Sequence, residues 1–316
     1  MFSPALGLDV PRESTLQFRS LPDAPFGVEV CGVTWCRPDA DTVRLLTAAL
    51  RRCLLLVLRG HTPPSEAQLD EFFRGFGRLV LDTEDGVAHY SGHRNLGGPA
   101  SALAQEMVAY QHRSLENTGS TYYDPGPEGA SELVWHNDQS HRPMLKVVSV
   151  LEALEVDPGV VPTEFRDTYT AYETLPRALR SDLEHRQIIY FDPRLPPPTE
   201  LPRLADAMHP VFTPHPHTGR RALFVNEFAD RVAGINREES DPILAALRAH
   251  ITTDAPRYVH QWRSGDIVVW DNIGVQHRRD AVREVVDVQG SSSGVRMCSE
   301  HRVHGIGQTR QLARRW

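Results

Sequence analysis

The chain has 316 residues, of which 40% are hydrophobic, enough for a complete core in one large or two modest domains. We expect a single domain spanning residues 1–316. The formal net charge of −7 supplies no basic field for nucleic acid or an anionic membrane surface. The four cysteines lack the spacing of a disulfide framework, and residues 1–13 lack the pattern of a secretory signal. We therefore expect a cytoplasmic protein.

The first part of the chain alternates strand and helix signals. Residues 27–34 have an extended pattern, and residues 41–53 carry the apolar stripe of a helix. The apolar run 54–58 then predicts a buried strand. Ser65 followed by Gln68 is the pattern of a capping box, which predicts a helix that continues to the next glycines.

Residues 82–132 form a long segment rich in Gly, Ser, Pro, Tyr and His, with one helical patch near 101–108. Irregular segments of this length in compact domains are usually functional or disordered. We expect a lid-like insertion that closes over a site and orients a substrate.

Short strands dominate the rest of the chain, with helices expected at 169–184 and 240–251. The expected strands are 133–135, 147–151, 187–191, 222–225, 266–270 and 295–303. Many short strands separated by turns predict a mainly β fold with flanking helices, closed or double-sheeted, instead of a doubly wound parallel sheet.

Three residues form a candidate metal site: His136, Asp138 and His277. His136 and Asp138 leave a predicted strand two residues apart, so their side chains share one face. About one His-x-Asp is expected by chance in a chain of this composition, so the pair alone is weak. His277 follows a hydrophobic strand and a turn, which would deliver a third ligand.

Two imidazoles and one carboxylate on one face of a metal leave three positions open, which suits iron(II) with a bidentate co-substrate and dioxygen. A structural zinc site would be closed by four protein ligands. The alternative is that His136 and His277 are unrelated, hydrogen-bonded histidines.

Motifs around these residues resemble the taurine dioxygenase family of iron(II)- and 2-oxoglutarate-dependent oxygenases over nearly the whole chain. The motifs are Phe26-Gly27 with Gly32, the run 54–59, Phe76-Gly77, His209-Pro210-Val211, His215-Pro216, Thr218-Gly219, the run 223–227, the run 250–252, Trp270-Asp271-Asn272 and Gln276-His277. The resemblance implies a double-stranded β-helix (jelly-roll) core. It also implies Fe(II), 2-oxoglutarate and O2, with succinate and CO2 as products and hydroxylation as the default outcome.

The resemblance further implies how 2-oxoglutarate would be held. The family grips its distal carboxylate with a threonine and an arginine, and Thr163 matches that threonine. Arg296 is the first choice for the arginine because its distance to Gly305 is similar to the family's spacing, and Arg302 is the reserve. A guanidinium can hold a carboxylate through two parallel hydrogen bonds. Asp138 fills the position that halogenating relatives leave vacant, which argues against halogenation.

Three acidic residues suggest a substrate class. Taurine-handling members bind the sulfonate with a loop histidine and a second arginine, and here Asp82 and Glu300 occupy those positions. Glu132 replaces an amide shortly before the first ligand. Carboxylates would repel a sulfonate and attract a cationic or amine-bearing small molecule. The alternative is that these acids are solvated or paired with arginines.

Several readings remain open at this point. The same cofactor chemistry could give desaturation, cyclisation or oxidative cleavage, since the outcome depends on how the substrate is placed, which the sequence does not reveal. A natural-product intermediate is one candidate substrate. A zinc-dependent hydrolase would act without oxygen and leave Thr163 and Arg296 without a role, and a non-catalytic jelly-roll binding protein would not need all three ligands. We expect a small-molecule substrate, no nucleic acid or membrane partner, and leave a homo-oligomer open.

Overall fold

The structure is a computed structural model that describes residues 10–11, 13–60, 62, 64–76, 78–80, 132–153, 156, 161–191, 207–280, 285–286, 292–293 and 309–313. Strands are its main elements. In chain order they are β1 (Gln17–Ser20), β2 (Val28–Cys31), β3 (Leu55–Leu58), β4 (Arg78–Val80), β5 (Leu133–His136), β6 (Val148–Glu152), β7 (Thr163–Asp167), β8 (Gln187–Tyr190), β9 (Ala207–Pro210), β10 (Phe212–Pro214), β11 (Arg221–Leu223), β12 (Ala229–Val232), β13 (Arg257–His260), β14 (Ile267–Asp271), β15 (Val275–Arg279), β16 (Val285–Val286), β17 (Ser292–Ser293) and β18 (Thr309–Ala313).

The described helices flank these strands. They are α1 (Ala40–Cys53), α2 (Glu66–Arg74), α4 (Thr168–Thr174), α5 (Arg177–Leu183) and α6 (Arg237–Asp254). The capping box predicted for α2 is confirmed, because the Ser65 side chain accepts from the Gln68 backbone and the Gln68 side chain accepts from the Ser65 backbone.

The single helix expected over 169–184 is wrong. The structure has α4 and α5 there, separated at Leu175 and Pro176. Proline disfavours a helical conformation in the residue before it, and Leu175 accordingly has an extended ψ of 134°.

Two sheets facing each other make the centre of the fold. One has seven strands in the order β1-β2-β3-β14-β6-β18-β4, and the other has four strands in the order β13-β7-β15-β5. Their inner faces share one hydrophobic cluster, in which Trp270 of β14 packs edge-on against Phe165 of β7 at a ring separation of 5.5 Å. This arrangement confirms the predicted mainly β, double-sheet core with flanking helices.

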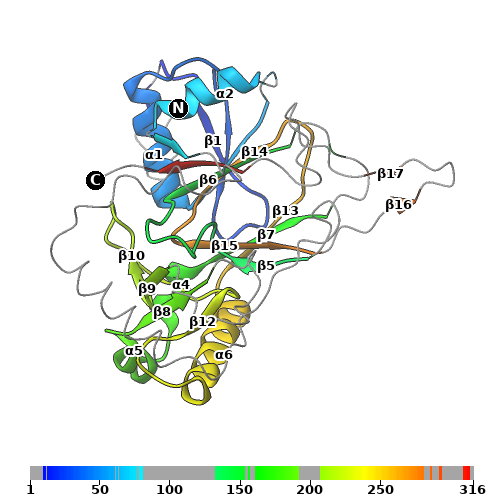
Figure 1. Cartoon of the computed structure of the whole chain (residues 1–316). Coiled ribbons are helices and arrows are strands. Elements are labelled where there is room, and N and C mark those ends of the chain that lie inside the picture. The colour runs from blue at the N-terminus through cyan, green and yellow to red at the C-terminus, as the bar shows by residue number, and fades with distance from the viewer. Residues whose placement is uncertain are drawn as a thin grey trace.

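Helices cover the outside of this core at two ends (Figure 1). Helices α1 and α2 pack on the outer face of the seven-stranded sheet, where Leu46, Leu50 and Phe72 join a second hydrophobic cluster with Leu56 of β3. At the opposite end, α4, α5 and α6 pack with β8, β9 and β12 around a third cluster. The ends of β5 and β15 lie between these two layers.

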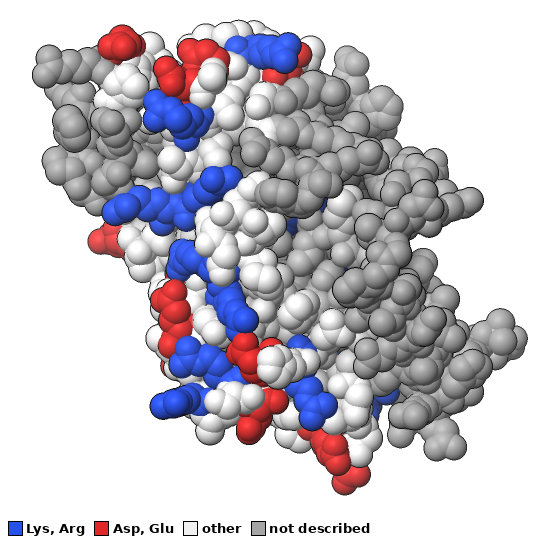
Figure 2. Space-filling view, turned by 90° about the vertical axis from the view of Figure 1, so that its left-hand side faces the viewer, with Lys and Arg blue, Asp and Glu red and all other residues white. Residues whose placement is uncertain are grey.

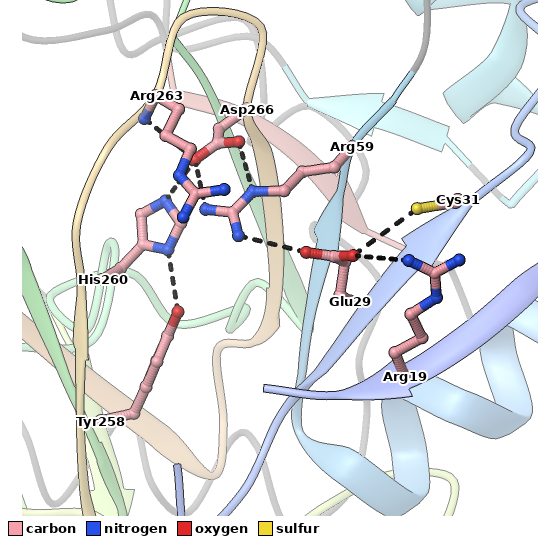
Figure 3. A network of polar contacts seen from close by, with 8 residues as sticks. All are labelled: Arg19, Glu29, Cys31, Arg59, Tyr258, His260, Arg263 and Asp266. Carbon is pink, nitrogen blue, oxygen red and sulfur yellow. Dashed lines mark hydrogen bonds and ion pairs between the residues drawn. The ribbon is translucent and has the colours of Figure 1, made fainter. Parts of the chain in front are cut away.

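A polar network ties the first strands to the rest of the seven-stranded sheet (Figure 3). Arg59, directly after β3, donates to both carboxylate oxygens of Asp266 at 2.7 and 2.8 Å and to Glu29 of β2 at 3.2 Å. Burial by itself would raise the pKa of Asp266, but hydrogen bonds from Arg59 and His260 outweigh it and hold this pKa at about 2. Asp266 is therefore ionised at neutral pH and links three segments of the chain.

On the face shown in Figure 2, basic and acidic side chains of the described residues are interspersed over the surface. Among the described helices, none has the length and hydrophobicity of a membrane span.

Two predicted segments cannot be compared with the structure. The expected lid at 82–132 lies outside the described residues except for its last position, and the expected strand at 295–303 lies entirely outside them. The single-domain organisation over 1–316 stays a prediction.

Candidate metal centre

The three predicted metal ligands converge between the two sheets. Strand β15 pairs with β5 so that His277 lies directly opposite His136, and the two rings are 4.1 Å apart. Asp138 follows β5, and its Oδ1 lies 3.6 Å from Nε2 of His136 and 3.7 Å from Nε2 of His277. All three ligand atoms lie within 4.8 Å of one another, and all three residues are buried. One metal ion at about 2.1 Å from each atom fits this triangle.

Neighbouring groups orient two of the ligands for a metal. Nδ1 of His136 lies 2.7 Å from the Val134 carbonyl oxygen, so it carries the proton and donates, which leaves the Nε2 lone pair for a metal. Ser149 of β6 donates to Oδ2 of Asp138 at 2.5 Å and leaves Oδ1 facing the histidines. The Asp138 carboxylate, which follows a strand of the four-stranded sheet, is thus hydrogen-bonded to Ser149 of the seven-stranded sheet.

The side chains of two asparagines hydrogen-bond the segment of His136 and Asp138 to the turn that precedes His277. Asn272 accepts from the Asp138 backbone N–H at 2.8 Å and donates to the Asp138 carbonyl at 3.1 Å. Asn137, between the two ligands, donates to the backbone carbonyls of Asn272 at 2.9 Å and Val275 at 3.3 Å. Because these contacts cross more than 130 residues of sequence, they fix the distance between His136, Asp138 and the strand that carries His277.

The turn between β14 and β15 has its own constraints. Asp271 accepts from the backbone N–H groups of Ile273 and Gly274 with one oxygen and from the Tyr169 hydroxyl with the other, at 2.7 Å. A Cβ at position 274 would lie 1.9 Å from the Tyr169 ring, so only glycine fits. The chain therefore reverses tightly and returns as β15 with His277 on the inner face.

Aromatic rings surround His277 and keep it neutral. Trp270 lies 4.8 Å from the His277 ring, and Phe165 stacks on it at 6.1 Å. Burial, reinforced by the nearby His136, lowers the pKa of His277 to about 3. Burial would raise the pKa of Asp138, but the facing histidines outweigh this and hold it below the usual range. A neutral imidazole and an ionised carboxylate are the forms that bind a metal.

Thr163 lies on the same inner face as the metal ligands. Strand β7 pairs Phe165 with His277, and Thr163, two residues away, shares the face of Phe165. Thr163 is 5% exposed, and its hydroxyl accepts from the Trp262 indole N–H at 3.0 Å. The threonine expected to hold 2-oxoglutarate is thus buried in the same interior as the metal ligands.

The structure does not bring Glu132 to this site. Glu132 is half exposed and pairs with Arg278 at 3.4 Å, on the face of the sheet opposite His277. The register of β5 shifts between Leu133 and His136, and such a bulge moves the residues before it to the other face. Four other expected site residues lie outside the described residues: Asp82, Arg296, Glu300 and Arg302.

The sequence did not indicate that Ser149 and Asn272 contact the metal ligands, or that Arg279 lies on the same face of the sheet as His277. Ser149 alternates with outward-facing residues on a predicted strand, so its inward direction could be inferred from the sequence. Its hydrogen-bond partner could not. Arg279 follows His277 by two residues, and β15 continues to it, which places it on the metal face with 6% exposure. The i, i+2 spacing from His277 predicts this face only once the strand is known to continue to Arg279.

Comparison with known proteins places the chain in a family. The model of the family described as "Taurine catabolism dioxygenase TauD, TfdA family" matches residues 17–291. An alpha-ketoglutarate-dependent 2,4-dichlorophenoxyacetate dioxygenase from Cupriavidus pinatubonensis is 36% identical over 241 residues, covering 71% of this chain and 78% of that protein. A pentalenolactone F synthase from Streptomyces avermitilis is 30% identical over 284 residues, covering 83% and 88%.

Solved structures share the fold. AAD-2 in complex with Mn(II) and N-oxalylglycine matches with a TM-score of 0.63 at 20% identity, over 95% of this chain and 98% of that one. A taurine dioxygenase from Burkholderia xenovorans matches with a TM-score of 0.59 at 21% identity, over 88% and 95%. The jelly-roll core, the buried His-Asp-His triad and the family match agree. The chain belongs to the TauD/TfdA family and is an Fe(II)- and 2-oxoglutarate-dependent dioxygenase.

Proposed function

We propose that this dioxygenase hydroxylates a C–H bond of a small organic molecule and releases succinate and CO2 from 2-oxoglutarate. The convergence of His136, Asp138 and His277 on one buried point carries the proposal. Three protein ligands on one side of iron(II) leave the other positions for the keto acid and dioxygen. With these groups bound, the centre supplies the oxidant for the C–H bond.

The chain's own residues prepare the site for this chemistry. Ser149 and the Val134 carbonyl hold Asp138 and His136 in the orientation that binds a metal. The rings of Trp270 and Phe165 exclude water from the side of His277. Because the ligands are held in place before the substrates arrive, little reorganisation is needed during the reaction.

We infer that the substrate is an intermediate or product of secondary metabolism. Two relatives support this choice by name: the pentalenolactone F synthases of Streptomyces arenae, 28% identical over 309 residues, and Streptomyces avermitilis, 30% identical over 284 residues. Desaturation, cyclisation or oxidative cleavage is the second candidate outcome, since the position of the substrate decides the fate of the attacked carbon.

The preference for a cationic or amine-bearing substrate remains part of the proposal, but it now depends on Asp82 and Glu300. Glu132 no longer contributes to it, because its partner is Arg278 on the outer face. Introducing the opposite charge, with Asp82→His and Glu300→Arg, should weaken binding of a cationic substrate. Unchanged binding in both variants would end this part of the proposal.

Substrate-stimulated succinate formation tests the function. Candidate small molecules are incubated with the protein, iron(II), 2-oxoglutarate and isotopically labelled dioxygen, and the products are analysed by mass spectrometry. Hydroxylation predicts a product that gains one labelled oxygen atom, whereas desaturation predicts the loss of two hydrogen atoms and no label. The Asp138→Ala variant is the control and should form neither product. Turnover of a substrate without air would contradict the proposal and favour a hydrolase.

A further inference from the structure

A cavity of about 80 Å³ lies between α1, α2 and the outer face of the seven-stranded sheet. Leu56 and Leu58 of β3 and Val269 of β14 form its floor, and they belong to the hydrophobic cluster that the two helices cover. Trp270, the residue after Val269, points to the other face of the sheet, where its ring lies 4.8 Å from the ring of His277. The sheet therefore separates this cavity from the metal centre.

The wall of the cavity opposite the sheet is apolar. It is lined by Leu46 and Leu50 of α1 and by Phe72 and Phe73 of α2. Phe72 packs edge-on against Phe73 at a ring separation of 5.3 Å and against Trp35 at 4.9 Å, which holds its ring in place. The space is roughly six times what one water molecule needs, but apolar walls offer water few hydrogen bonds. The interior of the cavity therefore suits a hydrocarbon group.

A permanent cation lies at the polar end of the cavity. Arg51 lines the cavity from the last turn of α1, next to Leu50, and is partly buried. In the described part of the chain, no group forms an ion pair or a hydrogen bond with its guanidinium. Thr47 lies four residues earlier on the same face of α1 and adds a hydroxyl to this end. A guanidinium beside a hydroxyl, at the end of an apolar space, can bind a carboxylate.

Two other polar residues at this end bond to their own surroundings. Burial lowers the pKa of His215, so its ring is neutral, and its Nδ1 accepts from the backbone N–H groups of residues 217 and 218 at 3.1 Å. Asp271 accepts from backbone N–H groups of its own turn with one oxygen and from the Tyr169 hydroxyl with the other, at 2.7 Å. Nε2 of His215 faces this second oxygen at 3.9 Å. Neither residue forms an ion pair with Arg51, whose charge is left for a ligand.

We propose that this cavity is a second binding site, which takes a small amphipathic carboxylate. The hydrocarbon chain of the ligand lies between Leu50 and Val269, and its carboxylate pairs with Arg51 and accepts a further hydrogen bond from Thr47. None of the described residues that line the cavity is a metal ligand. The ligand therefore binds without being oxidised, on the other side of the sheet from the keto acid and the substrate.

Calorimetry tests this site on the iron(II)-loaded protein with saturating 2-oxoglutarate and no air, so that the metal centre is occupied. Octanoate is the probe, and it should bind about tenfold more tightly than hexanoate, because each buried methylene contributes about threefold to fourfold. Arg51→Gln should weaken octanoate binding about tenfold, through the loss of a charged hydrogen bond. Arg52→Gln is the matched control, because Arg52 is the next residue of α1 but is exposed and outside the lining. It should bind octanoate within about twofold of the wild type.

Two comparisons separate the carboxylate contact from the apolar space. Octan-1-ol has the same chain without the charge, so Arg51→Gln and the wild type should bind it within about twofold of each other. Leu50→Phe narrows the cavity and should weaken the binding of both probes. Thermal denaturation checks that each variant is folded.

Four results would overturn the inference. The first is a wild type that does not bind octanoate. The second is equal octanoate affinity in Arg51→Gln and the wild type, or an equal loss in Arg52→Gln, either of which excludes the assigned cation. The third is unchanged binding of both probes in folded Leu50→Phe, which excludes the cavity. The fourth is the loss of octanoate binding in His136→Ala, which places the probe at the metal centre instead.

Discussion

Replacing Ser149 by alanine should weaken iron(II) binding about 10- to 100-fold while the protein stays folded. The Ser149 hydroxyl is fully buried and donates to Oδ2 of Asp138 at 2.5 Å. A hydrogen bond to a charged group contributes about 1.5–3 kcal/mol, and about 1.4 kcal/mol corresponds to a tenfold change in a binding constant. Loss of an outer-shell partner typically costs about 10- to 100-fold in metal affinity, which agrees with this range.

The assay is an anaerobic iron(II) titration at saturating 2-oxoglutarate, followed through the chelate band. Ser240 of α6 offers a matched control, because it is also fully buried and its hydroxyl accepts from the Val232 backbone N–H at 2.8 Å instead of bonding a metal ligand. Ser240→Ala should lose stability but keep its iron affinity. Iron affinity of Ser149→Ala within twofold of the wild type, or an equal loss in Ser240→Ala, would refute the assigned role.

Three further changes test the fold around the site. Gly274→Ala should destabilise the protein by about 1–3 kcal/mol in denaturant titration, because the new Cβ meets the Tyr169 ring at 1.9 Å; unchanged stability would contradict the described turn. Arg59→Met should cost about 3 kcal/mol, and much less in an Asp266→Leu background, because the first change alone leaves the buried Asp266 carboxylate without its guanidinium partner. Equal costs in both backgrounds would exclude coupling. Burial lowers the pKa of His209 from 6.5 to about 4. Between these two pH values the unfolded chain binds a proton at this residue that the folded chain does not, so stability decreases as pH falls from 6.5 to about 4. Denaturation at several pH values should therefore show a shallower loss in His209→Gln, and identical slopes would refute the claim.

Local signals in the sequence predicted several parts of the fold and the metal ligands. The apolar run at 54–58, the Ser65–Gln68 cap and the His136-x-Asp138 spacing each describe a conformation set by neighbouring residues. Strand β7 was not predicted, because its sequence Thr-Glu-Phe-Arg-Asp has few β-forming residues. It becomes a strand because β13 and β15 pair with both of its edges.

The remaining errors concern which face a residue occupies. Glu132 has an even spacing to His136 and would share its face on a regular strand, but the bulge in β5 turns it outward to Arg278. Arg279 could be assigned to the inner face only once the strand carrying His277 was known to continue that far. Both depend on pairing with a strand more than 100 residues away, which local sequence patterns do not report.

The most direct test of the metal site adds iron(II) and 2-oxoglutarate to the purified protein without air and records the visible spectrum. The wild type should develop the charge-transfer band of a bidentate keto acid on iron(II), and His136→Ala and His277→Ala should not. A band of full intensity in either variant would contradict the joint binding of iron by these two histidines and Asp138.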